Sequence, residues 1–290
     1  MDLSHRDRSE GWTHAKLSGH SNEAAILTLL QNDANYREQF LCRLGKSKCE
    51  ITDLRIGGLH ETDVPSIISD GRLTKSKTDL WVRFADGTTK NISIKKSAGG
   101  QVFLIKTERF IEGFQNHYQV QIPERVKCAM LLFWGAKENM SEYIQKFGDC
   151  DPRIHAYEMR KNRLVKTSLA RYDQSLPQEL LQWFRQNIGL LADFCFARGL
   201  ARDCENWANI VWYKNMLNEC SFDNLYNTAE ICSRVQTLTD ADADADADVV
   251  YYGNTLGGST IQLPFGFVQW HQNSMQFHHN FEKIQKLFCI

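Results

Sequence analysis

The chain has 290 residues, of which 42% are hydrophobic and 24% charged, and its net charge is −1 with a pI near 6.7. This length predicts one large domain or two small ones, with enough apolar residues for a substantial core. No stretch approaches the roughly 20 apolar residues that a membrane span requires, and the polar start of the chain argues against a secretory signal, so we expect a cytoplasmic protein with no membrane partner.

The nine cysteines do not form a recognisable framework. Their number is odd and no two of them form a CxxC pair, which argues against a set of disulfides or a structural zinc site. Reduced thiols in a cytosolic protein are the better interpretation.

The first quarter of the chain predicts two helices and a strand. Ser21 has the character of an N-cap, and the apolar spacing that follows predicts a helix over 22–31. A second helix is expected over 35–44. A short strand is expected over 51–56, ended by a pair of glycines.

The clearest local pattern is a hairpin. Residues 79–84 and 90–95 both alternate between apolar and polar side chains, and Asp86-Gly87 lies between them. An Asp-Gly pair between alternating runs is a strong signal for a two-stranded antiparallel turn.

Beyond the hairpin, helical patterns dominate until the C-terminal quarter. We expect a break at Gly99-Gly100, a strand at 102–104 and a helix over 108–117. Helices are expected from Pro123 to about residue 200, including a long one over 178–198. Strands are expected over 209–213, 260–271 and 275–279, followed by a final amphipathic helix. The Asp/Ala repeat at 240–248 lacks the glycine and glutamate of an EF-hand, and we interpret it as a solvated loop. The order of these elements predicts an α/β fold with a central mixed sheet flanked by helices and a helical subdomain.

Three side chains of the hairpin form a chemical group. Alternation places Ser93 and Lys95 on one face of their strand and Ile94 on the core face, and the paired strand brings Asp79 beside them. A carboxylate can hold Mg²⁺, which polarises a phosphoryl oxygen and helps to ionise a water, and a lysine can stabilise the negative charge that develops. The pattern therefore suits phosphodiester hydrolysis. A simple surface hairpin with a solvated lysine is the alternative.

The segment SKTDLWVRFADGTTKNISIKKS resembles the active-site hairpin of the PD-(D/E)XK nuclease superfamily, and most of all that of type II restriction endonucleases. The resemblance covers about a third of the chain, residues 18–114. It assigns the first acid of the motif to Asp79 and the lysine to Lys95. Thr78 stands where proline often precedes that acid. Ser93 stands where the second acid is expected, and a serine cannot supply a carboxylate's charge to a metal.

The resemblance implies that the missing acid comes from elsewhere in the chain. Glu108 and Glu112, on the helix after the hairpin, are candidates for a relocated acid. Glu23, in the segment GHSNEAA, is a candidate for the helix glutamate that many of these nucleases direct into the metal site. We favour Asp79, Glu108 and Glu23 as Mg²⁺ ligands, with Ser93 and Lys95 completing the catalytic group. For each glutamate the alternative is an ordinary exposed helix position.

Two regions offer side chains that could contact double-stranded DNA. One is the basic stretch 153–171, whose alternative is a solvated helix face. The other is the C-terminal hairpin, whose alternative is a core hairpin with a wet turn; its histidines lack a standard zinc spacing and the pattern of an HNH site. Base edges are recognised by Arg, Lys, Asn and Gln, whereas phosphate contacts position the protein. The candidate contacts are Lys77, Lys96, Arg160, Lys161, Arg163, Lys166, Gln269, His271, Gln272 and Asn273.

Together these features predict a single nuclease domain over residues 1–290. Its catalytic core would cover about 18–135 plus 249–290, with a helical DNA-recognition insertion over about 136–205. We expect a site-specific, Mg²⁺-dependent endonuclease acting as a homodimer, because twofold symmetric sites favour twofold symmetric proteins. A repair or modification-dependent nuclease of the same superfamily and a non-catalytic DNA-binding protein are the alternatives.

Overall fold

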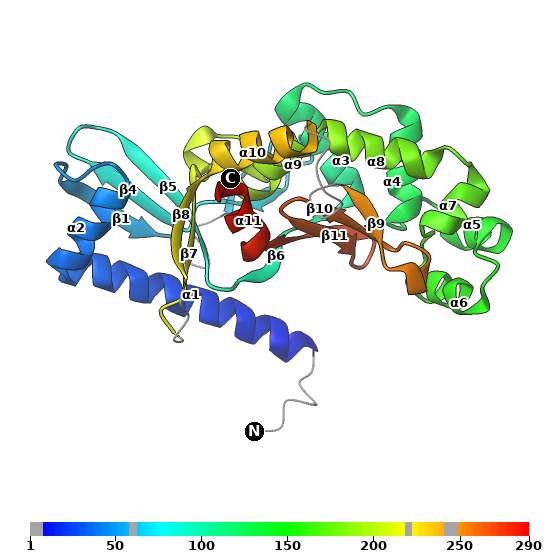
Figure 1. The fold of residues 1–290 in the computed structure, drawn as a ribbon, viewed down its shortest axis with the longest axis horizontal. Helices are drawn as coiled ribbons and strands as arrows, with labels where there is room; N and C mark the ends of the chain where they lie inside the picture. The colour runs from blue at the N-terminus through cyan, green and yellow to red at the C-terminus, as the bar shows by residue number, and fades with distance from the viewer. Residues whose placement is uncertain (1–7, 58–62, 218–221, 241–248, 290) are drawn as a thin grey trace. The chain divides into compact units, whose positions relative to one another are not determined.

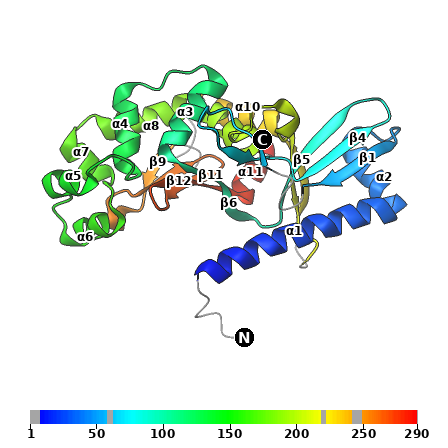
Figure 2. The same cartoon turned by 180° about the vertical axis from the view of Figure 1, so that it is seen from behind.

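The computed structural model describes residues 8–57, 63–217, 222–240 and 249–289. These residues divide into two compact units. The first comprises Met1–Pro65, Leu73–Ser97 and Ala201–Thr228, and the second comprises Ser66–Arg72, Ala98–Leu200 and Ala229–Ile290. Figure 1 and Figure 2 show the fold from its two sides.

A five-stranded mixed sheet with two helices forms the first unit. The strand order is β1-β4-β5-β7-β8, in which β5 and β7 are parallel and the other neighbours antiparallel. A separate pair, β2 and β3, is antiparallel. The elements of this unit are α1 (Arg8–Asn32), α2 (Ala34–Arg43), β1 (Ile51–Ile56), β2 (Asp63–Pro65), β3 (Leu73–Lys75), β4 (Leu80–Phe84), β5 (Thr89–Lys95), the short helix η2 (Cys204–Asn206), β7 (Ile210–Lys214) and β8 (Asp223–Asn227).

The helices α1 and α2 cover one face of this mixed sheet (Figures 1 and 2). Ile26 and Leu30 of α1 are fully buried and belong to the same apolar cluster as the inward side chains of β4 and β5. Phe40 of α2 stacks on Trp212 of β7 with ring centroids 5.1 Å apart. Alternation along β4 and β5 directs one set of side chains into this cluster and leaves the other set for the opposite face.

An antiparallel sheet and a group of helices form the second unit. The strand order is β6-β12-β11-β10-β9. The elements of this unit are β6 (Gly99–Lys106), α3 (Thr107–Tyr118), α4 (Glu124–Phe133), α5 (Met140–Phe147), α6 (Pro152–Lys161), α7 (Lys166–Tyr172), α8 (Leu176–Gln186), α9 (Ile188–Asp193), the π-helical turn η1 (Phe194–Arg198), α10 (Thr228–Asp240), β9 (Val250–Tyr252), the short helix η3 (Asn254–Leu256), β10 (Thr260–Leu263), β11 (Gly266–Trp270), β12 (Ser274–Asn280) and α11 (Phe281–Phe288). Thr228, the first residue of α10, is counted with the first unit.

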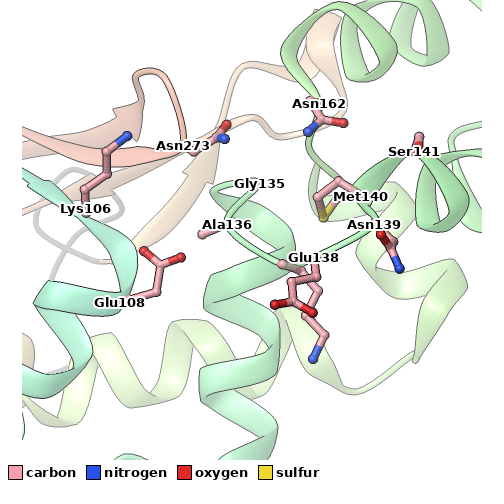
Figure 3. A pocket seen from close by; sticks show the side chains of 11 residues that line it. Lys106, Glu108, Gly135, Ala136, Glu138, Asn139, Met140, Ser141, Asn162 and Asn273 are labelled. Atoms are coloured by element: carbon pink, nitrogen blue, oxygen red, sulfur yellow. The ribbon is translucent and has the colours of Figure 1, made fainter.

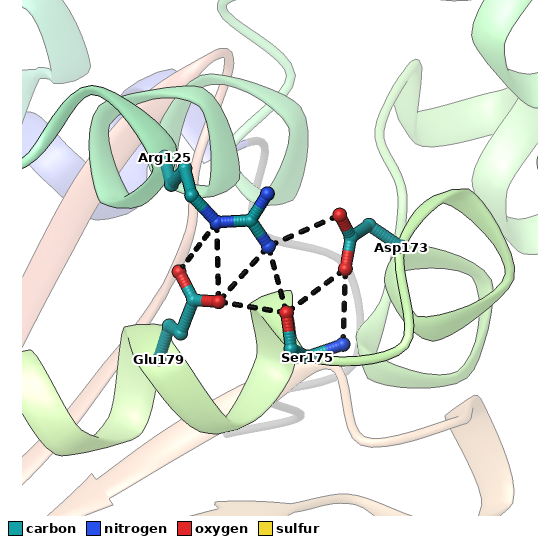
Figure 4. A network of polar contacts seen from close by, with 4 residues as sticks. All are labelled: Arg125, Asp173, Ser175 and Glu179. Atoms are coloured by element: carbon teal, nitrogen blue, oxygen red, sulfur yellow. Dashed lines mark hydrogen bonds and ion pairs between the residues drawn. The ribbon is translucent and has the colours of Figure 1, made fainter.

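A polar network joins three of the helices in the second unit (Figure 4). Arg125 on α4 donates hydrogen bonds to both carboxylate oxygens of Glu179 on α8, to Asp173 after α7 and to the Ser175 hydroxyl, at 2.7–3.2 Å. The Ser175 hydroxyl in turn lies 3.0 Å from Asp173 Oδ1 and 2.7 Å from Glu179 Oε1, and its hydrogen can be donated to either acid. Hydrogen bonds from the Ser175 amide and hydroxyl, and then from Arg125, lower the pKa of Asp173 below its usual range. Hydrogen bonds from Arg125, and then from the Ser175 hydroxyl, lower the pKa of Glu179.

Most predicted elements agree with the structure. The hairpin forms as β4 and β5, and Gly87 in its turn has a φ of +79°. The strand over 51–56, the helices over 35–44 and 108–117, the strand over 209–213 and the final helix also form, within one or two residues at their ends. The α/β class with a mixed sheet flanked by helices is confirmed.

Four local predictions are wrong. Helix α1 already begins at Arg8 and runs through Ser21, so that residue is not an N-cap. Gly99 and Gly100 belong to β6 instead of ending a strand. The long helix over 178–198 is three successive helical segments, α8, α9 and η1. The run 260–271 is two antiparallel strands, β10 and β11.

The division into a catalytic core and a recognition insertion remains a prediction. The C-terminal strands, which we assigned to the core, pair with β6 in the second unit. The acidic loop at 240–248 lies outside the described residues apart from Asp240, which ends α10.

Candidate active site

Asp79, Ser93 and Lys95 form a continuous hydrogen-bonded chain in the first unit. The Lys95 ammonium donates to the Ser93 hydroxyl at 2.7 Å, and that hydroxyl donates to Asp79 Oδ2 at 3.2 Å. Ser93 is buried, whereas Asp79 and Lys95 are partly exposed. The contacts confirm that Ser93 and Lys95 share one face of β5, and that Asp79, just before β4, lies beside them.

The backbone fixes the Asp79 carboxylate. The amide of Ile94 donates to Asp79 Oδ2 at 2.7 Å, and the Asp79 amide donates to the carbonyl of Ile92 at 2.9 Å. The carboxylate thus accepts a bond from a strand amide immediately beyond the β4–β5 ladder. Both side-chain contacts use Oδ2, and Oδ1 makes no hydrogen bond to the residues that the structure describes. Oδ1 is therefore available to a ligand such as a metal ion.

Helix α1 brings Glu23 to the same place. Burial raises the pKa of Glu23 to about 8, with a smaller contribution from the negative charge of Asp79, while Lys95 acts in the opposite direction. The side chain of Glu23 is only 12% exposed, and its Oε2 lies 3.2 Å from His20 Nδ1. The structure thus brings two carboxylates and one lysine together.

Asn22 anchors this part of α1. Its side chain is fully buried, donates to the Lys214 carbonyl at 3.0 Å and accepts from the Met216 amide at 2.7 Å. Lys214 ends β7, the parallel neighbour of β5. Asn215 donates to the carbonyl of Lys96, directly after β5. The helix is therefore attached at the carboxyl ends of the two parallel strands, where Lys95 also lies.

The donor set suits a hard divalent cation. Burial raises the pKa of Glu23, and the negative charge of Asp79 adds a smaller contribution, so a cation between the two carboxylates would favour the ionised form of Glu23. Within the described residues no group of three or more His, Cys, Asp or Glu side chains is placed to hold a metal. Mg²⁺ commonly uses one or two carboxylates and completes its shell with water and substrate phosphate, so Asp79 and Glu23 fit it better than they fit zinc.

Glu108 and Glu112, the other candidate acids, belong to the second unit. Glu108 lies in the first turn of α3 and lines a pocket there with Lys106 and Asn273. Glu112 is exposed on the same helix. Of the three candidate glutamates, Glu23 is the one that shares a unit with Asp79 and Lys95 and interacts with both.

The predicted DNA contacts occupy different environments. Four of the six basic side chains of the 153–171 stretch lie over aromatic rings: Arg160 over Tyr157, Lys161 over Trp270, Arg163 over Phe133 and Lys166 over Tyr251. Arg160 and Lys166 are exposed and Lys161 is half-buried. Lys77, before β4, and Lys96, after β5, are half-buried and both belong to the open end of the hairpin.

The prediction for Arg163 is wrong. Its side chain is fully buried, it lies 4.3 Å from the centre of the Phe133 ring, and burial lowers its pKa to about 10. A side chain enclosed in this way has no surface to present to DNA. The sequence showed only its place in a basic run, and the helix end that turns it inward depends on tertiary packing.

The C-terminal hairpin presents a polar face. Gln269 Nε2 donates to Gln276 at 2.9 Å and lies 3.2 Å from His278 Nε2, and Gln276 donates to Gln101 on β6 at 2.7 Å. The predicted turn forms at Gln272 and Asn273, both with positive φ as a type I′ turn requires. Exposed His271 and Gln272 lie at this tip.

Sequence reasoning missed several polar residues near these sites. Asn22 and His20 lie beside Glu23 in the segment that we singled out, but only the packing of α1 reveals their contacts. Asn139 and Asn162 line the pocket of Glu108. Asparagine next to a helix end is a signal for left-handed backbone, and it could have drawn attention to both.

Comparison with known proteins bears on the fold. The chain is similar to the crystal structure of the restriction endonuclease MspI in complex with its cognate DNA, with a TM-score of 0.50 and 10% sequence identity over 94% of this chain and 93% of that chain. The protein therefore has a restriction-endonuclease-like fold. No protein-family model and no curated protein sequence matches the chain. No helix among the described residues is long and apolar enough to cross a bilayer.

Proposed function

We propose that this protein is a Mg²⁺-dependent endonuclease that cleaves double-stranded DNA at specific sequences, as type II restriction enzymes do. The observation that carries the proposal is the chain from Asp79 through Ser93 to Lys95 with Glu23 beside it, on a restriction-endonuclease-like fold. Nuclease chemistry requires acids to hold a cation and a lysine to stabilise developing charge, and these groups meet here on rigid elements.

Each residue has a distinct role in this proposal. Asp79 Oδ1 and Glu23 would hold Mg²⁺, which supplies the polarisation of the phosphoryl oxygen and the acidification of a water. Lys95 would donate a hydrogen bond on the side from which water attacks the phosphate, and would stabilise the negative charge that develops there. Ser93 positions Lys95 by accepting its hydrogen bond and positions Asp79 by donating one.

The serine has an electrostatic consequence. A carboxylate at position 93 would neutralise Lys95 and add a third negative charge beside Glu23 and Asp79. The neutral Ser93 hydroxyl still orients Lys95, and the site carries less negative charge than it would with a carboxylate at this position. Glu23 on α1 then supplies the second acid, so we propose this residue, rather than Glu108, as the replacement for the missing acid of the motif.

We further propose that the protein acts as a homodimer on twofold symmetric sites. Substrate contacts would come from the exposed cations Arg160 and Lys166 and from the tip of the C-terminal hairpin. These side chains suit a duplex because cations bind phosphate and amides bind base edges.

A second candidate function is DNA binding without cleavage, favoured by the serine at position 93. The two functions are separated by incubating the protein with unmethylated phage DNA in Mg²⁺ and in EDTA, beside the variant Asp79→Ala. Discrete fragments that require both Mg²⁺ and Asp79 support the nuclease. Binding without cleavage in any divalent metal, unchanged by Asp79→Ala, would establish the second function instead.

A further inference from the structure

A polar pocket of about 470 Å³ lies in the second unit (Figure 3). Four segments meet around it: the junction of β6 and α3, the loop from α4 to α5, the end of α6 and the tip of the β11–β12 turn. Its polar lining includes Lys106, Glu108, Glu138, Asn139, Asn162 and Asn273. The volume falls within the range of small-molecule and nucleotide sites.

Three asparagines of the lining have left-handed backbone. The φ angles of Asn139, Asn162 and Asn273 are 54°, 51° and 57°. In the part of the chain that the structure describes, these are three of five non-glycine residues with positive φ. The type I′ turn explains the angle of Asn273, and the ends of α5 and α6 explain those of Asn139 and Asn162. These turns and helix ends place the three asparagines around one pocket.

The amides of these asparagines are available to a ligand. Hydrogen bonds of Asn139 and Asn273 within the described residues use their backbone carbonyls, which accept from Glu142 and Thr107. The Asn162 side chain likewise makes no hydrogen bond to a described residue. Lys106, which lines the pocket, also holds the β11–β12 turn in place, because its Nζ donates to the carbonyl of Gln272 at 2.9 Å.

The charged side chains around the pocket indicate which kind of ligand it would bind. Lys106 and Lys137 are balanced by Glu108 and Glu138, and Figure 3 shows the two carboxylates directed toward the space between them. A balanced pocket with carboxylate acceptors does not favour a phosphate. It suits a neutral group that carries amino hydrogens and ring acceptors. The exocyclic amino groups of adenine and cytosine have this character, since asparagine pairs with adenine N6 and N7 and glutamate accepts from cytosine N4.

We propose that this pocket reads the amino-bearing edge of a DNA base, adenine N6 or cytosine N4. The inference rests on the proposed action on duplex DNA and adds the place where sequence is read. Every base pair displays one such amino group in the major groove. A base swung out of the stack presents the same group, so the two sources share one chemistry.

Selection from a random duplex library in Mg²⁺ tests the proposal. All proteins carry Asp79→Asn, so that bound DNA is not cut. Asn162→Asp and Asn273→Asp keep the size and the backbone tolerance of asparagine but remove the amide donor that would bond adenine N7, and Glu108→Gln keeps the size of glutamate but replaces the carboxylate acceptor that would bond the amino group. We expect each variant to lose about tenfold or more of the preference at one base pair and to keep the preference at the others. Asn254→Asp, an exposed site in the same unit outside the pocket, should leave all preferences unchanged.

Modified DNA provides a measurement that does not depend on variant folding. N6-methyladenine or N4-methylcytosine at the affected base pair should weaken binding by the protein without pocket substitutions about tenfold. A 2-aminopurine placed beside that base should brighten on binding if the base is unstacked and stay dim if it is read within the groove.

Two results would overturn the inference. If the pocket variants weaken binding to all sequences equally, or leave every preference intact, the pocket does not read bases, although the nuclease proposal stands. If the protein with an unaltered pocket binds no duplex at all, the proposed function fails and the inference fails with it.

Discussion

The two units of the chain distribute their polar groups in contrasting ways. In the first unit, charged side chains gather at a half-buried position where Glu23, Asp79 and Lys95 interact. In the second unit, uncharged side chains such as Gln101, Gln269 and Gln276 form hydrogen-bonded rows across an open sheet face. Charge held away from water is costly and is typical of catalysis, whereas amides suit the recognition of base edges. The proposed function assigns catalysis to the first unit and recognition to the second, and the following substitutions test that assignment.

The largest effect is expected for Asp79→Asn. The substitution preserves shape and removes the charge that would hold Mg²⁺, so the rate of DNA cleavage should fall by about 10³-fold or more. Affinity for duplex DNA in EDTA should change by less than about threefold, because the side chains proposed for recognition belong to the second unit. Cleavage rate and binding measured on one duplex check this, and a comparable loss of both would refute the separation.

Glu23→Gln should alter activity and stability in opposite directions. The raised pKa of Glu23, about 8 against an ordinary 4.5, means that its ionisation destabilises the fold increasingly as pH rises from 4.5 to about 8. Without metal, the variant should therefore exceed the original protein in free energy of unfolding by roughly 4 kcal/mol at pH 8 and by almost nothing below pH 4.5.

Cleavage by Glu23→Gln should nevertheless fall about 100-fold, because one metal ligand is lost. Urea unfolding at several pH values and cleavage at saturating Mg²⁺ provide the two readouts. Glu112→Gln, at an exposed position of α3, serves as the control and should change neither. Unaltered cleavage by Glu23→Gln would show that this residue is not a metal ligand, and Glu108 would become the candidate for the second acid.

Asn22→Ala should destabilise the first unit. The substitution leaves the Lys214 carbonyl and the Met216 amide without their side-chain partner, which costs about 2–3 kcal/mol in a buried setting. The anchor of α1 is weakened as well, so cleavage should fall about tenfold even where the protein is folded. Asn35→Ala, exposed on α2, should cost less than about 0.5 kcal/mol. Equal losses at the two positions would show that Asn22 is no anchor.

The smallest effect is expected for Arg125→Gln in the second unit. The network of Figure 4 is largely exposed, and surface ion pairs contribute little, but here one guanidinium contacts two acids and a hydroxyl. We expect thermal unfolding to shift down by about 1–2 °C, less at high salt, with unchanged cleavage. Arg153→Gln, which removes a single exposed pair with Asp151, should cause almost no shift, and a shift as large as that of Arg125→Gln would argue against the network.

The hairpin that carries Asp79 and Lys95 could be predicted because its determinants are local. Alternation fixes which side chains share a face, and the Asp-Gly turn fixes the pairing of the two strands. The same reasoning could not choose among Glu23, Glu108 and Glu112. That choice depends on how α1 packs on the sheet, and the helix is attached by Asn22 to backbone nearly 200 residues away.

The errors have physical causes of the same kind. Residues 260–271 alternate like one strand, but the chain reverses near Gly266, where a Cβ would lie 1.9 Å from the carbonyl oxygen of His278. A basic run predicted an exposed Arg163, yet the end of α6 turns that side chain into the interior against Phe133. The order of strands in the second sheet, with β6 beside β12, joins distant segments and has no local signal.

Single-turnover cleavage of one duplex by Lys95→Ala and Lys90→Ala tests the central claim most directly. Both lysines lie on β5, but only Lys95 is bonded to Ser93 in the chain that leads to Asp79. The account predicts that Lys95→Ala lowers the rate of the chemical step by about 10²- to 10³-fold at unchanged DNA affinity, while Lys90→Ala cleaves at the original rate. Equal rates for the two variants would contradict the assignment of Asp79, Ser93 and Lys95 as a nuclease active site.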